Sequence, residues 1–210
     1  MKKISKILAA NRSEIAIRIF RAAEESGIKT AAIYSKEDRF AIHRFKTDES
    51  YLVGEGKGPI QAYLDIDSII KIAKDAKVDA IHPGYGFLSE SPELAEQCEK
   101  NDITFIGPSK EILKRFGNKT EAKKVAEEAK VGTVPSVLVT KENLKSVEKE
   151  VEKIGYPVIV KASWGGGGRG MRVVRSSNEL IDQITTAQSE SLKAFGKDEV
   201  FIEKFLEDAA

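Results

Sequence analysis

Apolar residues in the first half of the chain form two alternating patterns. Short runs of aliphatic and β-branched residues predict buried strands, and apolar residues three or four positions apart predict amphipathic helices. The predicted strands are 4–10, 29–34, 79–82 and 103–106, and helices are predicted after Asn11, over 65–77 and over 92–101. Strands that alternate with helices in this way predict a parallel sheet covered by helices.

Capping residues mark where these helices begin. Asn11 can cap the helix that follows it, with Glu14 three residues later as its capping-box partner. Ser91 and Pro92 have the residue types preferred at an N-cap and at the first helical position. Gly107-Pro108 interrupts the pattern, and we expect the first domain to end near Phe116.

The second half continues with a different order of elements. Strands are predicted at 134–139, 158–160, 171–174 and 199–203, with helices over 144–154 and from Ser176. An earlier helix has Asn118 as its expected cap and Lys119 in its first turn, where an anion is favoured. A solvated surface lysine is an equally good interpretation of Lys119. The order strand–helix–strand–loop–strand–helix–strand predicts an α+β subdomain over 134–203, hinged at both ends.

A glycine-rich segment lies between two of these predicted strands. Glycine permits positive φ and close backbone approach, so consecutive N–H groups can turn toward one anion, while Lys161 and Arg169 add positive charge. A flexible spacer is the alternative, but spacers seldom lie between two apolar strands with a basic residue on each flank. The segment lacks the P-loop spacing and is followed by a strand, so we predict a hairpin that closes over the phosphates of a nucleotide.

The loop His82–Glu90 follows a predicted strand and precedes the helix at Pro92. Ligands of open α/β sheets bind at the carboxyl ends of strands, and Tyr85 and Phe87 offer flat apolar surfaces there. A turn with a packed aromatic residue remains an alternative. The chain has 2 histidines, which argues against a histidine-rich metal site.

Composition narrows the class of protein. The chain has 210 residues, room for one large domain or two small ones, and its 34 basic and 33 acidic residues nearly cancel. No net field therefore favours nucleic acid or an anionic membrane. The single Cys98 excludes an intrachain disulfide and fits a reducing cytosol, and no apolar run reaches membrane-spanning length. We expect a globular, cytoplasmic protein.

Four motifs together resemble the biotin carboxylase family of ATP-grasp enzymes: KILAANRSEIA from Lys6, HPGYGFLSE from His82, FIGP from Phe105 and KASWGGGGRGM from Lys161. The resemblance covers the whole chain in order. It implies a Rossmann-like pre-ATP-grasp domain over 1–116 and a partial ATP-grasp domain over 117–210, with a lid subdomain at about 134–203. Segments 43–51 and 58–66 are most similar to the pyruvate carboxylases, with acetyl-CoA and propionyl-CoA carboxylases as alternatives.

The family reaction implied by the resemblance has two steps. ATP, with Mg²⁺, phosphorylates bicarbonate to carboxyphosphate, and the CO₂ that this releases carboxylates biotin held on a carrier domain. Water destroys carboxyphosphate, which is a physical reason for a closing lid. By motif match, the ATP-binding residues would be Lys119, Lys161, Gly165, Gly166, Gly167, Gly168, Met171, Glu203, Lys204 and Leu206. Tyr85 and Gly86 would lie near biotin.

The family pattern continues well past Leu206. The part that follows carries the acidic Mg²⁺ ligands, the bicarbonate-binding residues and the arginine that stabilises the biotin enolate. The resemblance therefore assigns no catalytic residue and no metal ligand to this chain. We expect the chain to be inactive alone, to need the remainder of the carboxylase, and to form a homo-oligomer when complete. A non-catalytic nucleotide-binding fragment, or another ATP-grasp ligase acting on a carboxylate, are the alternatives.

Overall fold

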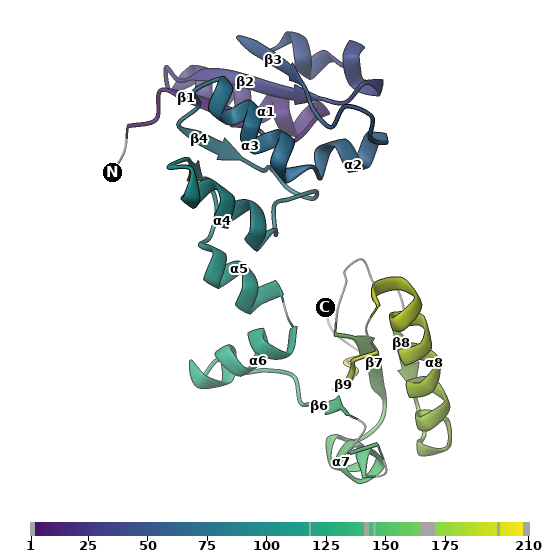
Figure 1. The fold of residues 1–210 in the computed structure, drawn as a ribbon. Coiled ribbons are helices and arrows are strands. Elements are labelled where there is room, and N and C mark those ends of the chain that lie inside the picture. The colour runs from purple at the N-terminus through teal and green to yellow at the C-terminus, as the bar shows by residue number, and fades with distance from the viewer. Residues whose placement is uncertain are drawn as a thin grey trace. The chain divides into compact units, whose positions relative to one another are not determined.

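The computed structural model describes residues 3–117, 119–140, 143–144, 146–163, 171–196 and 198–207 (Figure 1). The chain divides into two compact units, Met1–Lys114 and Arg115–Ala210. Among the described residues, none of the helices combines the length and the apolar character needed to cross a membrane.

The first unit contains a five-stranded parallel sheet with the order β3-β2-β1-β4-β5. Its strands are β1 (Lys6–Ala9), β2 (Lys29–Tyr34), β3 (Glu49–Leu52), β4 (Ala80–His82) and β5 (Thr104–Phe105). The predicted parallel, helix-covered sheet is therefore confirmed. Because β1 lies between β2 and β4, the strand order reverses beside β1. In open α/β sheets this reversal is where ligands usually bind.

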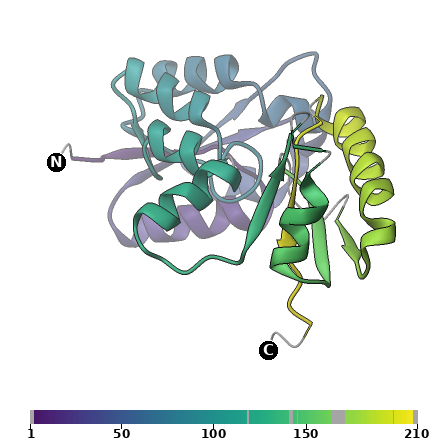
Figure 2. The ribbon, with the colours of Figure 1, turned by 90° about the horizontal axis from the view of Figure 1, so that it is seen from below.

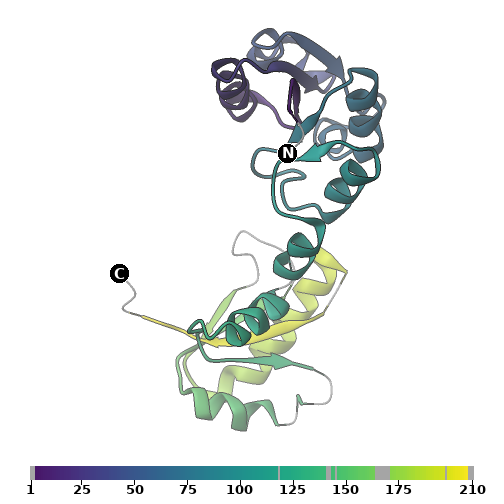
Figure 3. The same cartoon turned by 90° about the vertical axis from the view of Figure 1, so that its left-hand side faces the viewer.

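Helices cover both faces of this sheet. They are α1 (Ser13–Glu25), α2 (Pro59–Tyr63), α3 (Ile66–Asp75) and α4 (Pro92–Lys100). The unit also contains the 3-10 turns η1 (Glu37–Phe40) and η2 (Ile42–Phe45) and the start of α5 (Lys110–Gly117). Side chains alternate along β1, so Ile7 packs in a cluster with residues of α1 and Leu8 in a cluster with residues of α3 and α4. Figure 3 shows α1 in purple on one side of the sheet and α3 and α4 on the other.

The predicted cap of the first helix is wrong. The N-cap of α1 is Arg12, and no side chain caps it by a hydrogen bond. Asn11 is fully buried, and its Nδ2 donates to the carbonyl oxygens of Pro83 at 2.7 Å and Tyr85 at 3.0 Å. The predicted Ser91 cap is confirmed, because its hydroxyl accepts a hydrogen bond from the N–H of Leu94 at 3.2 Å.

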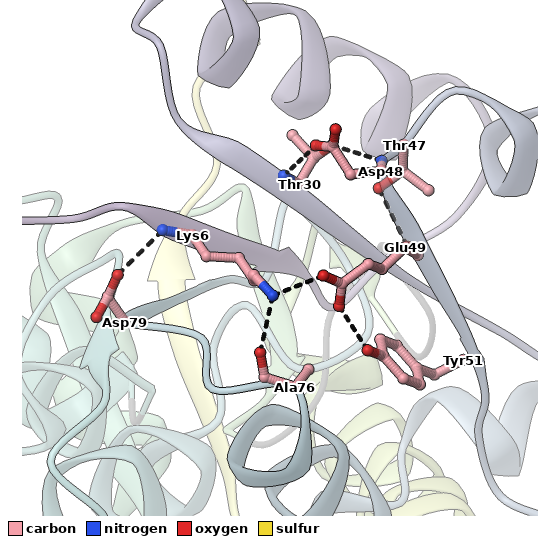
Figure 4. Close-up of polar contacts among 8 residues, drawn as sticks. All are labelled: Lys6, Thr30, Thr47, Asp48, Glu49, Tyr51, Ala76 and Asp79. Atoms are coloured by element: carbon pink, nitrogen blue, oxygen red, sulfur yellow. Dashed lines mark hydrogen bonds and ion pairs between the residues drawn. The ribbon is translucent and has the colours of Figure 1, made fainter.

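The segment between β2 and α3 contains elements that the sequence pattern missed, among them the edge strand β3. Its sequence, Glu-Ser-Tyr-Leu, is too polar to resemble a buried strand. A polar network holds it (Figure 4). Lys6 Nζ reaches past β2 to Glu49 Oε1 at 2.6 Å and also donates to the Ala76 carbonyl at 3.0 Å, while the Tyr51 hydroxyl donates to Glu49 Oε2 at 2.5 Å.

The second unit contains a four-stranded antiparallel sheet with the order β6-β9-β7-β8. Its strands are β6 (Ser136–Val139), β7 (Val158–Ala162), β8 (Arg172–Val174) and β9 (Val200–Lys204), and its helices are α6 (Lys119–Glu128), α7 (Val147–Ile154) and α8 (Ser177–Phe195). The predicted order of strands and helices from 134 to 203 is confirmed. Figure 2 shows α8 running alongside the sheet.

One face of this sheet forms a core with α7 and α8. The core combines side chains from all four strands with those of the two helices: Val139, Val147, Val151, Val158, Val160, Val174, Leu180, Ile184, Ala187, Val200 and Ile202. Helix α7 ends at Gly155, whose φ of 79° suits a residue without a Cβ. The other face of the sheet carries the polar residues of the candidate site.

Candidate functional site

Strand alternation brings Lys161 and Glu203 onto the same face of the second sheet. Val160 on β7 and Ile202 on β9 pair with each other and point into the core. Their neighbours Lys161 and Glu203 therefore point to the opposite face. Because Glu203 pairs with Ile159, two residues before Lys161, the lysine and the glutamate are diagonal neighbours.

A cluster of three charged side chains forms there. Lys161 Nζ lies 2.6 Å from Glu203 Oε2, and Lys123 Nζ, from α6, lies 3.6 Å from Glu203 Oε1. The Lys123 ammonium also donates to the Val134 carbonyl. The cluster carries one net positive charge, which favours an anion. Sequence reasoning missed Lys123, because nothing distinguishes it from a surface lysine on a helix.

Other residues predicted to bind ATP have different surroundings. The Lys204 ammonium donates to the carbonyls of Gly155 at 3.0 Å and Tyr156 at 2.9 Å, so its side chain ties β9 to the segment that follows α7. Met171 and Leu206 are exposed beside β8 and β9. Lys119 is the first residue of α6, but its side chain lies outside the described part, as do Gly165–Gly168.

In the first unit, the loop after β4 is held tightly against the start of α1. Its carbonyls accept the two hydrogen bonds from Asn11 described above. The Gly84 N–H donates to His82 Nδ1 at 3.0 Å, and burial lowers the pKa of His82, so this imidazole is a neutral acceptor. Gly84 has a φ of 69°, and a Cβ there would lie 2.5 Å from Ile15 Cγ2. Only glycine fits this approach.

The two aromatic residues of this loop differ in their roles. Phe87 stacks on Tyr63 with ring centroids 5.2 Å apart, so it is a packing residue. Tyr85 is 66% exposed, and its hydroxyl donates to Glu14 Oε2 at 3.3 Å. Among the described residues outside 85–87, no heavy atom lies within 4 Å of where a Cβ on Gly86 would be, so the space at Gly86 is open. A groove of about 670 Å³, lined in part by Ile15, adjoins Tyr85.

Protein side chains occupy the place where the strand order reverses. Arg12 Nη1 lies 3.1 Å from Asp38 Oδ2, and the Tyr63 hydroxyl donates to the same oxygen at 2.8 Å. The guanidinium also lies 5.8 Å from the Tyr63 ring centroid and 5.9 Å from that of Phe87. Burial raises the pKa of Tyr63, which therefore stays protonated and donates to Asp38.

The candidate site offers donors and charge for a nucleotide but no metal cluster within the part of the chain that the structure describes. No three His, Cys, Asp or Glu side chains come together there as ligands.

Family models match both halves of the chain. Residues 3–113 match "Biotin carboxylase, N-terminal domain", and residues 118–209 match "Carbamoyl-phosphate synthase L chain, ATP binding domain". Pyruvate carboxylase of Bacillus subtilis is 56% identical over 207 residues, which are 99% of this chain and 18% of that protein. This chain thus spans under a fifth of the length of the curated relatives it matches.

Solved structures give the same result. Rhizobium etli pyruvate carboxylase T882A with acetyl coenzyme A aligns with a TM-score of 0.86 and 54% identity, over 98% of this chain and 18% of that one. The biotin carboxylase domain of Hydrogenobacter thermophilus 2-oxoglutarate carboxylase, in complex with MgADP, ADP and bicarbonate, aligns with a TM-score of 0.90 and 41% identity, over 99% and 45% of the chains. Because the biotin carboxylase N-terminal domain model alone matches more than half of the residues, the chain belongs to the biotin carboxylase family.

Proposed function

We propose that this chain supplies the nucleotide-binding side of a biotin carboxylase that uses ATP and bicarbonate to carboxylate biotin on a carrier domain. The pyruvate carboxylase relatives favour pyruvate as the final acceptor over an acyl-CoA. The observation that carries the proposal is the Lys161–Glu203 pair on the face of the second sheet opposite α7 and α8, with a net positive charge beside it.

In this proposal, ATP lies against that face. Lys161, Lys119 and the backbone of Gly165–Gly168 hold the phosphates, because phosphoryl transfer needs positioning and neutralised charge. Met171 and Leu206 flank the adenine with their exposed apolar side chains. Glu203 and Lys204 line the same slot. The Lys204 ammonium is bound to two carbonyls, which leaves its backbone as the contact.

Biotin, in this proposal, lies at the loop after β4. Tyr85 offers an exposed ring, and the open space at Gly86 lets a ligand approach the backbone. Asn11 fixes the shape of the loop through its carbonyls.

The complete protein would work with partners that this chain does not supply by itself. The Hydrogenobacter relative holds MgADP and bicarbonate, and we assign the same ligand classes to the complete protein. Mg²⁺ would neutralise the phosphate charge. Residues outside these 210 would supply the metal ligands and the catalytic residues. We also propose a homo-oligomer in the cytoplasm.

Calorimetric titration of ATP into this chain tests the nucleotide site. Lys161→Met should weaken binding about tenfold, which corresponds to about 1.4 kcal/mol, because the phosphates lose an ammonium partner. Lys153→Met, at an exposed lysine of α7, is the matched control and should bind ATP as the parent does. The proposal is wrong if the parent binds no ATP, or if both variants lose the same affinity at unchanged melting temperature.

A further inference from the structure

Glu203 is shared between two lysines in a partly desolvated place. Its Oε2 lies 2.6 Å from Lys161 Nζ and its Oε1 lies 3.6 Å from Lys123 Nζ. The side chains of Lys123, Lys161 and Glu203 are 18%, 28% and 19% exposed. Charge interactions here are stronger than on an open surface, because little water screens them.

This sharing creates a competition for Lys161. The ammonium that would bind a nucleotide phosphate is already bound to a carboxylate at a short distance. When Lys161 moves to a phosphate, Glu203 loses that partner, and an unpaired charge in a mostly buried place is unfavourable. The second lysine removes part of this cost, because it contacts the other carboxylate oxygen.

Lys123 is also fixed in place independently of Glu203. It projects from α6, and its ammonium donates to the Val134 carbonyl, just before β6. The Val134 carbonyl thus gives the ammonium a second partner besides Glu203, which keeps it near β6 when Lys161 turns toward a ligand. Its charge stays beside Glu203 whatever Lys161 does.

We propose that Lys123 is a positioning residue for nucleotide binding: it stays paired with Glu203 and thereby leaves Lys161 available to a phosphate. This inference rests on the proposed nucleotide site. It separates the two lysines of the cluster by role, since Lys161 contacts the ligand and Lys123 acts through Glu203.

The test compares ATP with adenosine, which has no phosphate, by calorimetry on the 210-residue chain. Lys123→Met should weaken ATP binding about tenfold and adenosine binding less than twofold, because Glu203 then keeps Lys161. Glu203→Gln added to Lys123→Met should restore the ratio of ATP affinity to adenosine affinity to within about threefold of the parent ratio, because a neutral amide holds the ammonium more weakly than a carboxylate does. Lys124→Met is the matched control, since this neighbour on α6 forms an exposed ion pair with Glu121 at 2.8 Å.

The outcomes separate the two proposals. If the parent binds no ATP, the nucleotide site itself is wrong. If the parent binds ATP and Lys123→Met binds it equally well, the positioning role is wrong. Equal losses for ATP and adenosine, or no recovery in the double variant, also overturn it. Should Lys123→Met fail to fold, Lys123→Arg and Lys123→Gln replace it: the charged variant should keep ATP affinity, and the neutral one should lose it.

Discussion

Single residues show what a sequence can indicate about polar groups. The sequence predicts that Asn11 caps the helix that follows it, and this prediction is wrong. In the structure Asn11 binds Pro83 and Tyr85 carbonyls, 72 and 74 residues away. The spacing of residues in the sequence indicates hydrogen-bond partners a few positions away only. It cannot predict a contact that forms because β4 lies beside β1. The same limit hid Lys123, whose partner Glu203 is on a strand 80 residues later.

At this scale, Tyr85→Ala tests the proposed biotin loop. The measurement is biotin-dependent ATP cleavage by this chain joined to the remaining part of a pyruvate carboxylase biotin carboxylase region. The KM for biotin should rise about tenfold through loss of the exposed ring, while the KM for ATP changes less than twofold. Phe40→Ala, at an exposed aromatic residue of η1, serves as the control. A matched rise in both KM values would contradict the placement of biotin.

Strands that are buried on both faces, and helices with a periodic apolar stripe, could be predicted from the sequence. The strands β1, β2, β7 and β9 have apolar runs and were found, whereas the edge strand β3 was missed because it is held by polar groups. The order β6-β9-β7-β8 was also beyond prediction, since β9 joins between β6 and β7 through pairings that periodicity does not encode. The glycine-rich hairpin between β7 and β8 lies outside the described residues and stays a prediction.

The Lys6 network gives a prediction about the first sheet. Lys6→Met should lower the free energy of unfolding by about 1.5–3 kcal/mol, because Glu49 and the Ala76 carbonyl lose a charged donor. Lys71→Met removes an ion pair with the same 2.6 Å separation at an exposed site, and should cost under about 0.5 kcal/mol. Urea denaturation near pH 7 checks both values. Equal losses would show that Lys6 acts only as a surface charge.

The same variant has a defined pH dependence. The hydrogen bond from Lys6 is the main cause that lowers the pKa of Glu49 below 4.5, followed by that from Tyr51. A lowered folded-state pKa contributes stability that is present above the unfolded value and is lost as the pH falls below it. The difference between the parent and Lys6→Met should therefore shrink when the pH is lowered from about 7 to below 4.5. A difference that grows on acidification would contradict this.

At the scale of the whole molecule, each unit contains its own sheet and its own buried clusters. The alternation of strands and helices predicted the parallel sheet of the first unit, and the order of elements in the second half predicted an α+β subdomain without specifying its strand pairing. The positions of α1, α3 and α4 followed from the same alternation, whereas α2 and α5 were not predicted. The ion pairs that join Lys123, Glu203 and Lys161 could be identified only in the structure.

A pair of core substitutions tests whether the units are energetically separate. Ile184→Ala in α8 and Ile69→Ala in α3 each empty a fully buried position and should cost about 2–5 kcal/mol. Hydrogen exchange should become faster in β6–β9 for the first variant and in β1–β5 for the second. Faster exchange in both sheets from either variant would show that the two units unfold together.

The pairing of β1 with both β2 and β4 has a consequence during synthesis on the ribosome. Ile7 pairs with Thr30 and with Ala80. Asn11 donates hydrogen bonds to the carbonyls of Pro83 and Tyr85. The first strand therefore emerges from the ribosome long before its last partners are translated. Until then its apolar residues stay accessible, and this interval is when a nascent chain would recruit a chaperone.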